Sequence, residues 1–199
     1  MIYLLRHGEI DSEGEKRFIG WTDLPLNEDG VRQARQWRTK LSDTVFERIY
    51  CSDLCRTRRT AEIIGEKRGV DIRDTPALRE IHLGEFETLR MAEVKDRFPD
   101  KWRERGENLF SYRPMGGESF SDLCDRVLPT FDTIAGDAGG NILIVAHAGV
   151  NRMILCRVLG MPPEHLFRIG QDYACLNRID CGAKPYRVTA MNITLDTLS

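Results

Sequence analysis

Long apolar runs are absent from this chain of 199 residues. No stretch approaches the length that spans a bilayer, and the first apolar residues run at once into Arg6 and His7, so a signal-peptide core is missing too. We therefore expect a cytoplasmic protein with no membrane partner.

The chain also lacks an excess of charge of either sign. It carries 29 basic and 31 acidic residues, for a net charge of -2 with histidine neutral. This balance offers no electrostatic footprint for nucleic acid. Repeats, linkers and low-complexity tracts are missing as well, and the length suits a single domain over residues 1–199.

Cysteines occur without the spacing of a structural metal site. A pair four residues apart has no second matching pair, which zinc sites usually need. Because no export signal precedes them, we expect reduced thiols. The six are Cys51, Cys55, Cys124, Cys156, Cys175 and Cys181.

What the sequence does contain is an alternation of short apolar strands and amphipathic helices. Strands are expected at 2–5, 48–52, 70–75 and 141–147, followed by 173–180 and 186–193 as a hairpin around Gly182. Helices are expected from an Asn27 cap to 41 and over 56–69, 120–134 and 149–160. This order predicts an α/β fold, a three-layer sandwich with a mostly parallel central sheet.

Residues 78–120 interrupt that alternation with charge, aromatics, prolines and poor periodicity. We interpret them as a lid-like insertion of helical excursions and loops that selects the substrate. The candidate selecting residues are Arg90, Trp102, Arg105, Tyr112 and Arg113.

Polar side chains follow several of the expected strands. A lone histidine at a strand end is more often structural than catalytic, but the carboxyl ends of parallel strands share one edge. That edge would gather Arg6, His7, Arg56, Glu80 and His147.

Such a set suits phosphoryl transfer. Two arginine forks can bind nonbridging oxygens, and His7 can attack phosphorus while its other ring nitrogen donates to a backbone carbonyl. His147 would add a hydrogen bond or positive charge, and Glu80 would protonate the leaving oxygen and then deprotonate water.

At these residues the sequence resembles the histidine phosphatase superfamily, also called phosphoglycerate mutase-like. The matching segments are "LLRHGE", "RFIGWTDLPLNEDG", "CSDLCRTRRTA", "LREIHLGEFE", "GGES" and "VAHAGV". The resemblance implies a phosphohistidine on His7, proton donation by Glu80 and no metal or other cofactor. It implies a substrate pocket of Arg6, Arg56, His147, Gly20 and Ala148. Glu85, in "LGEFE", is the competing acid.

The first loop departs from the family, which typically has threonine or serine three residues after the histidine and asparagine six after. Here Ile10 and Glu13 stand at those places. An ionised Glu13 would repel a phosphate dianion, so we expect it to turn away and pair with Lys16 or Arg17.

Within the family, the length and the tail "GMPPEHLFRIGQDYACLNRID" are most similar to alpha-ribazole phosphatase, an enzyme of cobalamin assembly. The resemblance thus implies hydrolysis of a small-molecule phosphate ester. A phosphoglycerate mutase is the alternative enzyme, although this chain lacks the longer central insertion of cofactor-dependent mutases. A non-catalytic module that binds phosphorylated ligands is the alternative of another class. The sequence does not fix the oligomeric state and allows a homodimer.

Overall fold

The computed structural model describes residues 1–11 and 17–196. A six-stranded sheet lies at its centre in the order β3-β2-β4-β1-β5-β6. The strands are β1 (Ile2–Arg6), β2 (Phe46–Cys51), β3 (Asp71–Asp74), β4 (Asn141–Ala146), β5 (Leu176–Asp180) and β6 (Arg187–Ile193). The first four pair in parallel, and β5 and β6 are antiparallel, which confirms the predicted α/β class and mostly parallel sheet.

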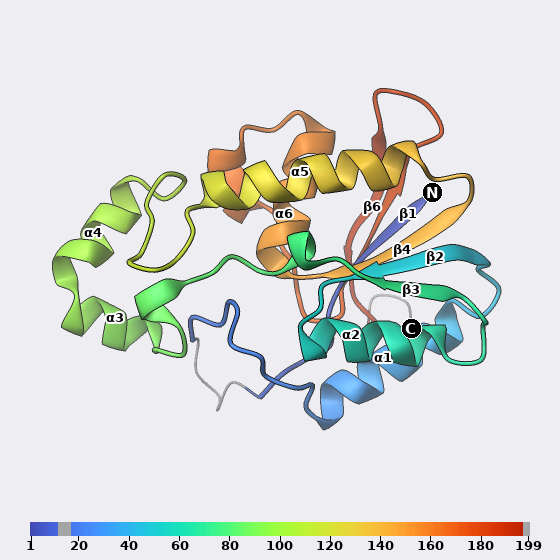
Figure 1. Ribbon diagram of the computed structural model, residues 1–199, viewed down its shortest axis with the longest axis horizontal. Helices are drawn as coiled ribbons and strands as arrows, with labels where there is room; N and C mark the ends of the chain where they lie inside the picture. The colour runs from blue at the N-terminus through green and yellow to red at the C-terminus, as the bar shows by residue number, and fades with distance from the viewer. Residues whose placement is uncertain (12–16, 197–199) are drawn as a thin grey trace.

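Helices cover both faces of the sheet (Figure 1). One face carries α1 (Glu28–Lys40) and α2 (Cys55–Gly65), and the other carries α5 (Phe120–Gly136) and α6 (Ala148–Leu159). The strand β4 separates two apolar cores: Ile142 and Ile144 face α5 and α6, whereas Leu143 and Val145 face α1 and α2. This alternation is the two-residue period of a strand buried on both sides.

Local chemistry explains most helix boundaries. The Asn27 side chain accepts the Gly30 N–H at 2.8 Å and caps α1, as the sequence predicts. The helix α2, however, ends at Gly65 and not at the predicted Gly69. Lys67 adopts a φ of 63°, which a helix does not allow, and this turn lets Arg68 donate to the carbonyls of Arg38, Leu41 and Thr44 near the end of α1.

The segment between β3 and α5 is irregular. It contains the short 3-10 helices η1 (Pro76–Leu78) and η2 (Gly84–Phe86) and the helices α3 (Met91–Arg97) and α4 (Pro99–Glu107). Figure 1 shows α3 and α4 beyond one end of the sheet, away from the amino terminus. A further 3-10 helix, η3 (Pro163–Arg168), precedes β5. In the described part of the chain, no helix has the length and apolar character needed to cross a membrane.

Candidate active site

Two histidines lie side by side because of strand register. In the parallel pair β1 and β4, Arg6 pairs with Ala146, so the next residues, His7 and His147, leave the sheet together. Their rings are 5.1 Å apart between centroids and nearly edge to face. Sheet hydrogen bonding therefore sets the spacing of these two imidazoles.

The backbone around His7 is fixed on both sides. Its N–H donates to the Ala146 carbonyl, and its own carbonyl accepts the Ala174 N–H, both at 3.0 Å. The following glycine packs directly against α1, where a Cβ on Gly8 would lie 2.5 Å from the Gly30 carbonyl oxygen. A larger residue after His7 would therefore push the loop away from α1.

The tautomer of His7 follows from one contact. Its Nδ1 lies 2.7 Å from the Gly8 carbonyl oxygen, which can only accept, so Nδ1 carries the hydrogen and Nε2 keeps its lone pair. Burial, together with the positive charges of Arg6 and Arg56, holds the pKa of His7 well below its usual value. The ring is thus neutral at pH 7, as a nucleophile must be.

His147 is also neutral in this site. Its pKa is lowered by burial first, then by the charge of Arg56 and the neighbouring His7. Its Nε2 lies 2.8 Å from the hydroxyl of Ser52, which in turn lies 2.6 Å from the hydroxyl of Thr57. The Nδ1 atom of His147 is buried and has no hydrogen-bond partner among the described residues.

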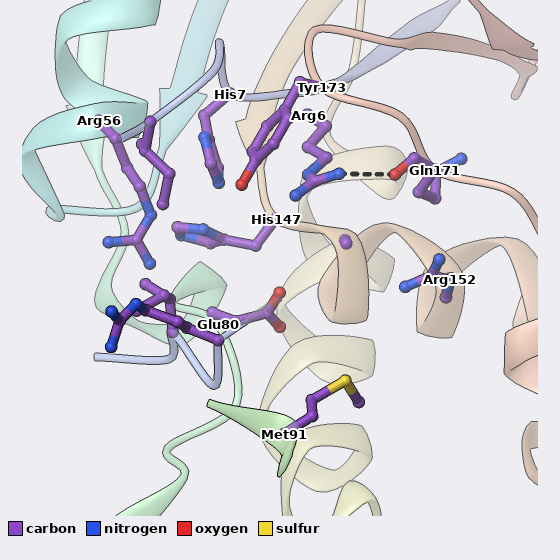
Figure 2. Close-up of a pocket in the computed structure, with 13 residues that line it drawn as sticks. Arg6, His7, Arg56, Glu80, Met91, His147, Arg152, Gln171 and Tyr173 are labelled. Atoms are coloured by element: carbon purple, nitrogen blue, oxygen red, sulfur yellow. Dashed lines mark hydrogen bonds between the residues drawn. The ribbon is translucent and has the colours of Figure 1, made fainter. Parts of the chain in front are cut away.

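Two arginines flank the histidines (Figure 2). Arg56 lies in the first turn of α2 and donates to the carbonyls of Gly20 and Thr22 at 2.6 and 2.9 Å. Arg6 donates to the Gln171 carbonyl at 2.7 Å and stacks on the Tyr173 ring, 3.8 Å from its centroid. In both guanidinium groups the Nε is buried and lacks a partner within the described residues.

Glu80 reaches this cluster from the irregular segment. One carboxylate oxygen accepts the Gly149 N–H at 3.0 Å, in the first turn of α6, and the other accepts the Ile81 N–H at 3.0 Å. The competing carboxylate, Glu85, instead pairs with Lys101 and accepts the Met115 N–H. Lys101 in particular holds the pKa of Glu85 below its usual value. Geometry thus brings Glu80, and not Glu85, to the histidines.

These groups line one cavity of about 530 Å³. Its lining residues are Arg6, His7, Ile10, Arg17, Ile19, Arg56, Glu80, Met91, His147, Ala148, Arg152, Gln171 and Tyr173. Four arginines and one glutamate give the cavity an excess of positive charge, which suits an anionic ligand. Among the residues the structure describes, no group of three or more histidine, cysteine or acidic side chains could hold a metal ion.

The other sequence-predicted residues take varied places. Ala148 lines the cavity, but Gly20 does not. The Gly20 carbonyl accepts a hydrogen bond from Arg56. Ile10 is buried, pairs with Leu26 and lines the cavity. Glu13 and Lys16, whose pairing the sequence suggests, lie outside the described residues.

None of the five candidate selecting residues lines this cavity. Tyr112 stacks on Phe86, Arg105 lies over Phe18, and Arg113 pairs with Asp122. Substrate selection by these five residues stays a prediction.

Sequence reasoning missed several cavity residues. Arg152 stands four residues after Ala148 on α6, so the helical repeat could have placed both on one face. Gln171 and Tyr173 lie in an irregular stretch before β5 and gave no local signal. The Gln171 side chain is fixed by the buried amides of Asn151 and Asn177.

Glu87 also went unassigned, although it supports the arginine pocket. Its carboxylate accepts from the backbone of Gly20, Trp21, Thr22 and Leu83 and from the Thr22 hydroxyl. Burial alone would raise its pKa, but these hydrogen bonds outweigh burial and lower the pKa. The carboxylate thus orders the loop whose carbonyls hold Arg56.

Solved structures with the same fold include phosphatases. A putative alpha-ribazole-5'-P phosphatase from Escherichia coli superposes with a TM-score of 0.90 at 26% identity, covering 96% of this chain and 95% of that one. A mycobacterial glucosyl-3-phosphoglycerate phosphatase superposes with a TM-score of 0.85 at 26% identity, covering 97% and 98%.

Sequence relatives carry a different name. A probable phosphoglycerate mutase GpmB from Serratia proteamaculans is 33% identical over 187 residues, which cover 93% of this chain and 86% of the relative. The family profile of the histidine phosphatase superfamily (branch 1) matches residues 2–194. The chain belongs to the histidine phosphatase superfamily, as the residues around His7 predict.

Proposed function

We propose that this protein hydrolyses phosphate monoesters of small molecules through a phosphohistidine on His7. The observation that carries the proposal is the cavity in which His7 lies together with Arg6, Arg56 and His147. The His7 ring keeps its lone pair on Nε2, because its Nδ1 donates to the Gly8 carbonyl. The two guanidinium groups beside it supply positive charge for the nonbridging oxygens of a phosphate.

The same residues support a balanced two-step reaction. The Nε2 lone pair of His7 attacks phosphorus, and the bond from phosphorus to the ester oxygen breaks as the new P–N bond forms. Glu80, in its acid form, gives its proton to the departing oxygen, and an alcohol leaves. Water then attacks the phosphohistidine and gives a proton to Glu80. The P–N bond breaks and inorganic phosphate leaves.

Positive charge supports the transition state of both steps. Arg6 and Arg56 stand ready to bind the nonbridging oxygens, and each is already oriented by backbone carbonyls. His147 adds a donor from Nδ1, because the Ser52 hydroxyl can donate to Nε2 and leave the ring hydrogen on Nδ1. No metal takes part in this scheme.

For the substrate we favour alpha-ribazole 5'-phosphate. The likeness in fold to the putative alpha-ribazole-5'-P phosphatase supports this choice, as does the similar carboxyl-terminal stretch that supplies Gln171 and Tyr173. A nucleotide-like ester also suits a cavity in which the ring of Tyr173 stands beside the phosphate-binding Arg6.

A phosphoglycerate mutase is the second candidate. A mutase must hold a bisphosphorylated intermediate while it reorients, which needs additional positive charge. Arg17 and Arg152 supply such charge in the cavity wall, beyond Arg6 and Arg56. The relatives named probable phosphoglycerate mutase point the same way.

One panel of substrates separates these functions. Purified protein is incubated with alpha-ribazole 5'-phosphate, 3-phosphoglycerate, a nucleoside monophosphate and 4-nitrophenyl phosphate, and both inorganic phosphate and isomerised ester are measured. We expect phosphate release, highest kcat/KM for alpha-ribazole 5'-phosphate, and no change with EDTA. Formation of 2-phosphoglycerate without phosphate release would establish the mutase. Ligand binding without turnover would establish the binding module.

A further inference from the structure

The chain around Glu80 has no regular secondary structure to hold it. Residues 79–83 lie between η1 and η2, outside every strand and helix. A carboxylate that must transfer a proton needs a fixed position, within hydrogen-bond reach of the leaving oxygen. The backbone of this segment must therefore be held by groups from elsewhere in the fold.

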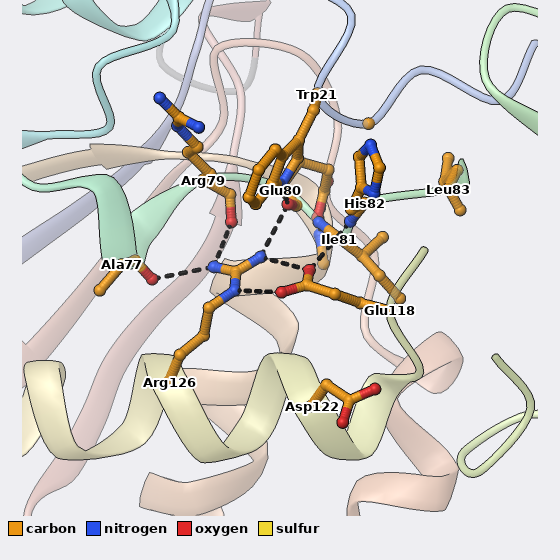
Figure 3. Close-up of polar contacts among 12 residues, drawn as sticks. Trp21, Ala77, Arg79, Glu80, Ile81, His82, Leu83, Glu118, Asp122 and Arg126 are labelled. Atoms are coloured by element: carbon orange, nitrogen blue, oxygen red, sulfur yellow. Dashed lines mark hydrogen bonds and ion pairs between the residues drawn. The ribbon is translucent and has the colours of Figure 1, made fainter. Parts of the chain in front are cut away.

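Arg126 supplies that hold from α5 (Figure 3). Its Nη1 donates to the carbonyls of Ala77 and Arg79 at 2.9 and 2.7 Å, and its Nη2 donates to the carbonyl of Glu80 itself at 2.8 Å. One guanidinium group thus gathers three carbonyls that lie within four consecutive residues. Trp21 adds a second donor to the Glu80 carbonyl at 2.7 Å.

Glu118 completes the arrangement. It precedes the Ser119 cap of α5 and accepts from the Nε and Nη2 of Arg126, each at 2.8 Å. The Glu118 carboxylate also accepts the His82 N–H at 2.9 Å, two residues beyond Glu80. All five N–H groups of Arg126 are therefore engaged, and the segment is held on both sides of Glu80.

We propose that Arg126 is a positioning residue for the acid catalyst: its guanidinium fork, oriented by Glu118, holds the Glu80 carboxyl group at the leaving oxygen. The inference rests on the proposed function, because it assigns Arg126 an effect on proton transfer through Glu80. Arg126 is not among the residues that line the cavity. It contacts the segment through the carbonyls that it binds, and its positive charge also helps to lower the pKa of His147, an effect that Arg126→Lys retains.

The fork, and not the positive charge alone, carries this role. Lysine keeps the charge, but its ammonium group cannot reach three carbonyls and a bidentate carboxylate from one point. Arg126→Met removes both charge and donors, whereas Arg126→Lys removes only the fork. If the fork positions Glu80, both variants lose proton donation by Glu80, and the loss in Arg126→Lys is only partly smaller than the loss in Arg126→Met.

The kinetic test uses the dependence on leaving group. Esters with poor alkyl leaving groups need the proton from Glu80, whereas nitrophenyl esters leave without it. We expect Arg126→Met to lower kcat/KM, which reports only the steps up to loss of the leaving group, by about 100-fold for an alkyl phosphate and by less than about 5-fold for 4-nitrophenyl phosphate. In the background of Glu80→Gln, the same substitution should add little, because the acid is already gone.

Arg157→Met is the matched control. Arg157 pairs with Asp132 of α5 but donates to none of the carbonyls from Ala77 to Glu80. This variant should keep the wild-type ratio of alkyl to nitrophenyl turnover. Equal losses on both esters in Arg126→Met and Arg126→Lys, with thermal stability close to wild type, would overturn the proposal.

A second measurement reads the position of Glu80 without turnover. The Gly149 amide donates to the Glu80 carboxylate, so its NMR shift and hydrogen exchange report that contact. We expect both Arg126 variants to shift this amide toward its position in Glu80→Gln, and Arg157→Met to leave it unchanged. An unmoved Gly149 amide in Arg126→Met would contradict the positioning role of Arg126, even if the protein turned over no phosphate ester. If the Gly149 amide moved but the protein hydrolysed no phosphate ester, the proposed function alone would be contradicted.

Discussion

His7 and His147 stand at the ends of two paired strands, whereas Glu80 stands on a segment without regular structure. The histidines inherit their spacing from backbone hydrogen bonds that any sequence in this register would form. The position of Glu80 depends on the side chains of Arg126 and Trp21, which donate to its backbone carbonyl, and on the Gly149 N–H, which donates to its carboxylate. Substitutions should therefore disturb the two regions in different ways.

The largest expected effect separates the two histidines. Replacing His7 by asparagine removes the proposed nucleophile of the first step, which is also the leaving group of the second, and we expect turnover of 4-nitrophenyl phosphate to fall by at least about 10⁴-fold. Replacing His147 by asparagine removes one donor to the transition state, and we expect a loss of about 10²-fold. Initial rates, with thermal melting as a check on folding, measure both. Equal losses would show that His7 has no special role.

The next effect separates Glu80 from Glu85. Glu80→Gln should lower kcat/KM for an alkyl phosphate by about 10²- to 10⁴-fold while leaving kcat/KM for 4-nitrophenyl phosphate within a few-fold of wild type. Glu85→Gln is the control, since Glu85 pairs with Lys101 away from the cavity. Measuring each variant with a series of leaving groups shows which carboxylate donates the proton. A selective loss with poor leaving groups in Glu85→Gln would assign that role to Glu85.

A smaller effect tests the support of the arginine pocket. Glu87→Gln weakens charged hydrogen bonds to the loop of Gly20, Trp21 and Thr22, and we expect about 2 kcal/mol less stability and a KM raised about tenfold. The control, Glu62→Gln, removes only exposed pairs with Arg58 and Arg59 and should cost less than about 1 kcal/mol. Urea unfolding and steady-state kinetics measure the two. An unchanged KM in Glu87→Gln would show that the order of the loop of Gly20, Trp21 and Thr22 does not affect phosphate binding.

The smallest effect concerns pH. The folded-state pKa values of His7 and His147 lie below their unfolded value near 6.5, so the unfolded chain binds more protons as pH falls. Their contribution is fully present above about pH 6.5 and is lost on acidification, on the order of 1 kcal/mol per pH unit for each. Thermal melting between pH 7.5 and 5.5 should show this decline, and His147→Asn should flatten it. If the melting temperature of His147→Asn declined as steeply with falling pH, His147 would not be a cause of the decline.

The same contrast explains what the sequence could predict. Apolar runs before His7 and His147 indicate parallel strands, and parallel strands place their ends together, so this part of the site follows from local patterns. Glu80 was placed at this edge because it follows the third expected strand, but the choice between Glu80 and Glu85 came from the resemblance, because no periodic pattern fixes an irregular segment. The end of α2 at Gly65 depends on contacts of Arg68 with α1, which lie far away in sequence.

Cavity residues from the carboxyl-terminal part were harder to foresee. Gln171 and Tyr173 meet Arg6 through contacts that span more than 160 residues, and neither lies in a strand or helix. The arginines and aromatics of residues 78–120 that were predicted to select the substrate do not line the cavity in the structure. Composition could not show which way these side chains point.

The most direct test of a histidine nucleophile is to trap the intermediate. The protein is mixed with ³²P-labelled substrate, quenched with alkali within milliseconds, digested and mapped by mass spectrometry. We expect one acid-labile, alkali-stable phosphoryl group on His7, absent from His7→Asn and still formed, more slowly, by His147→Asn. A label on His147, on a hydroxyl or on a carboxylate, or turnover with no trapped label in the wild-type protein, would contradict the phosphohistidine on His7.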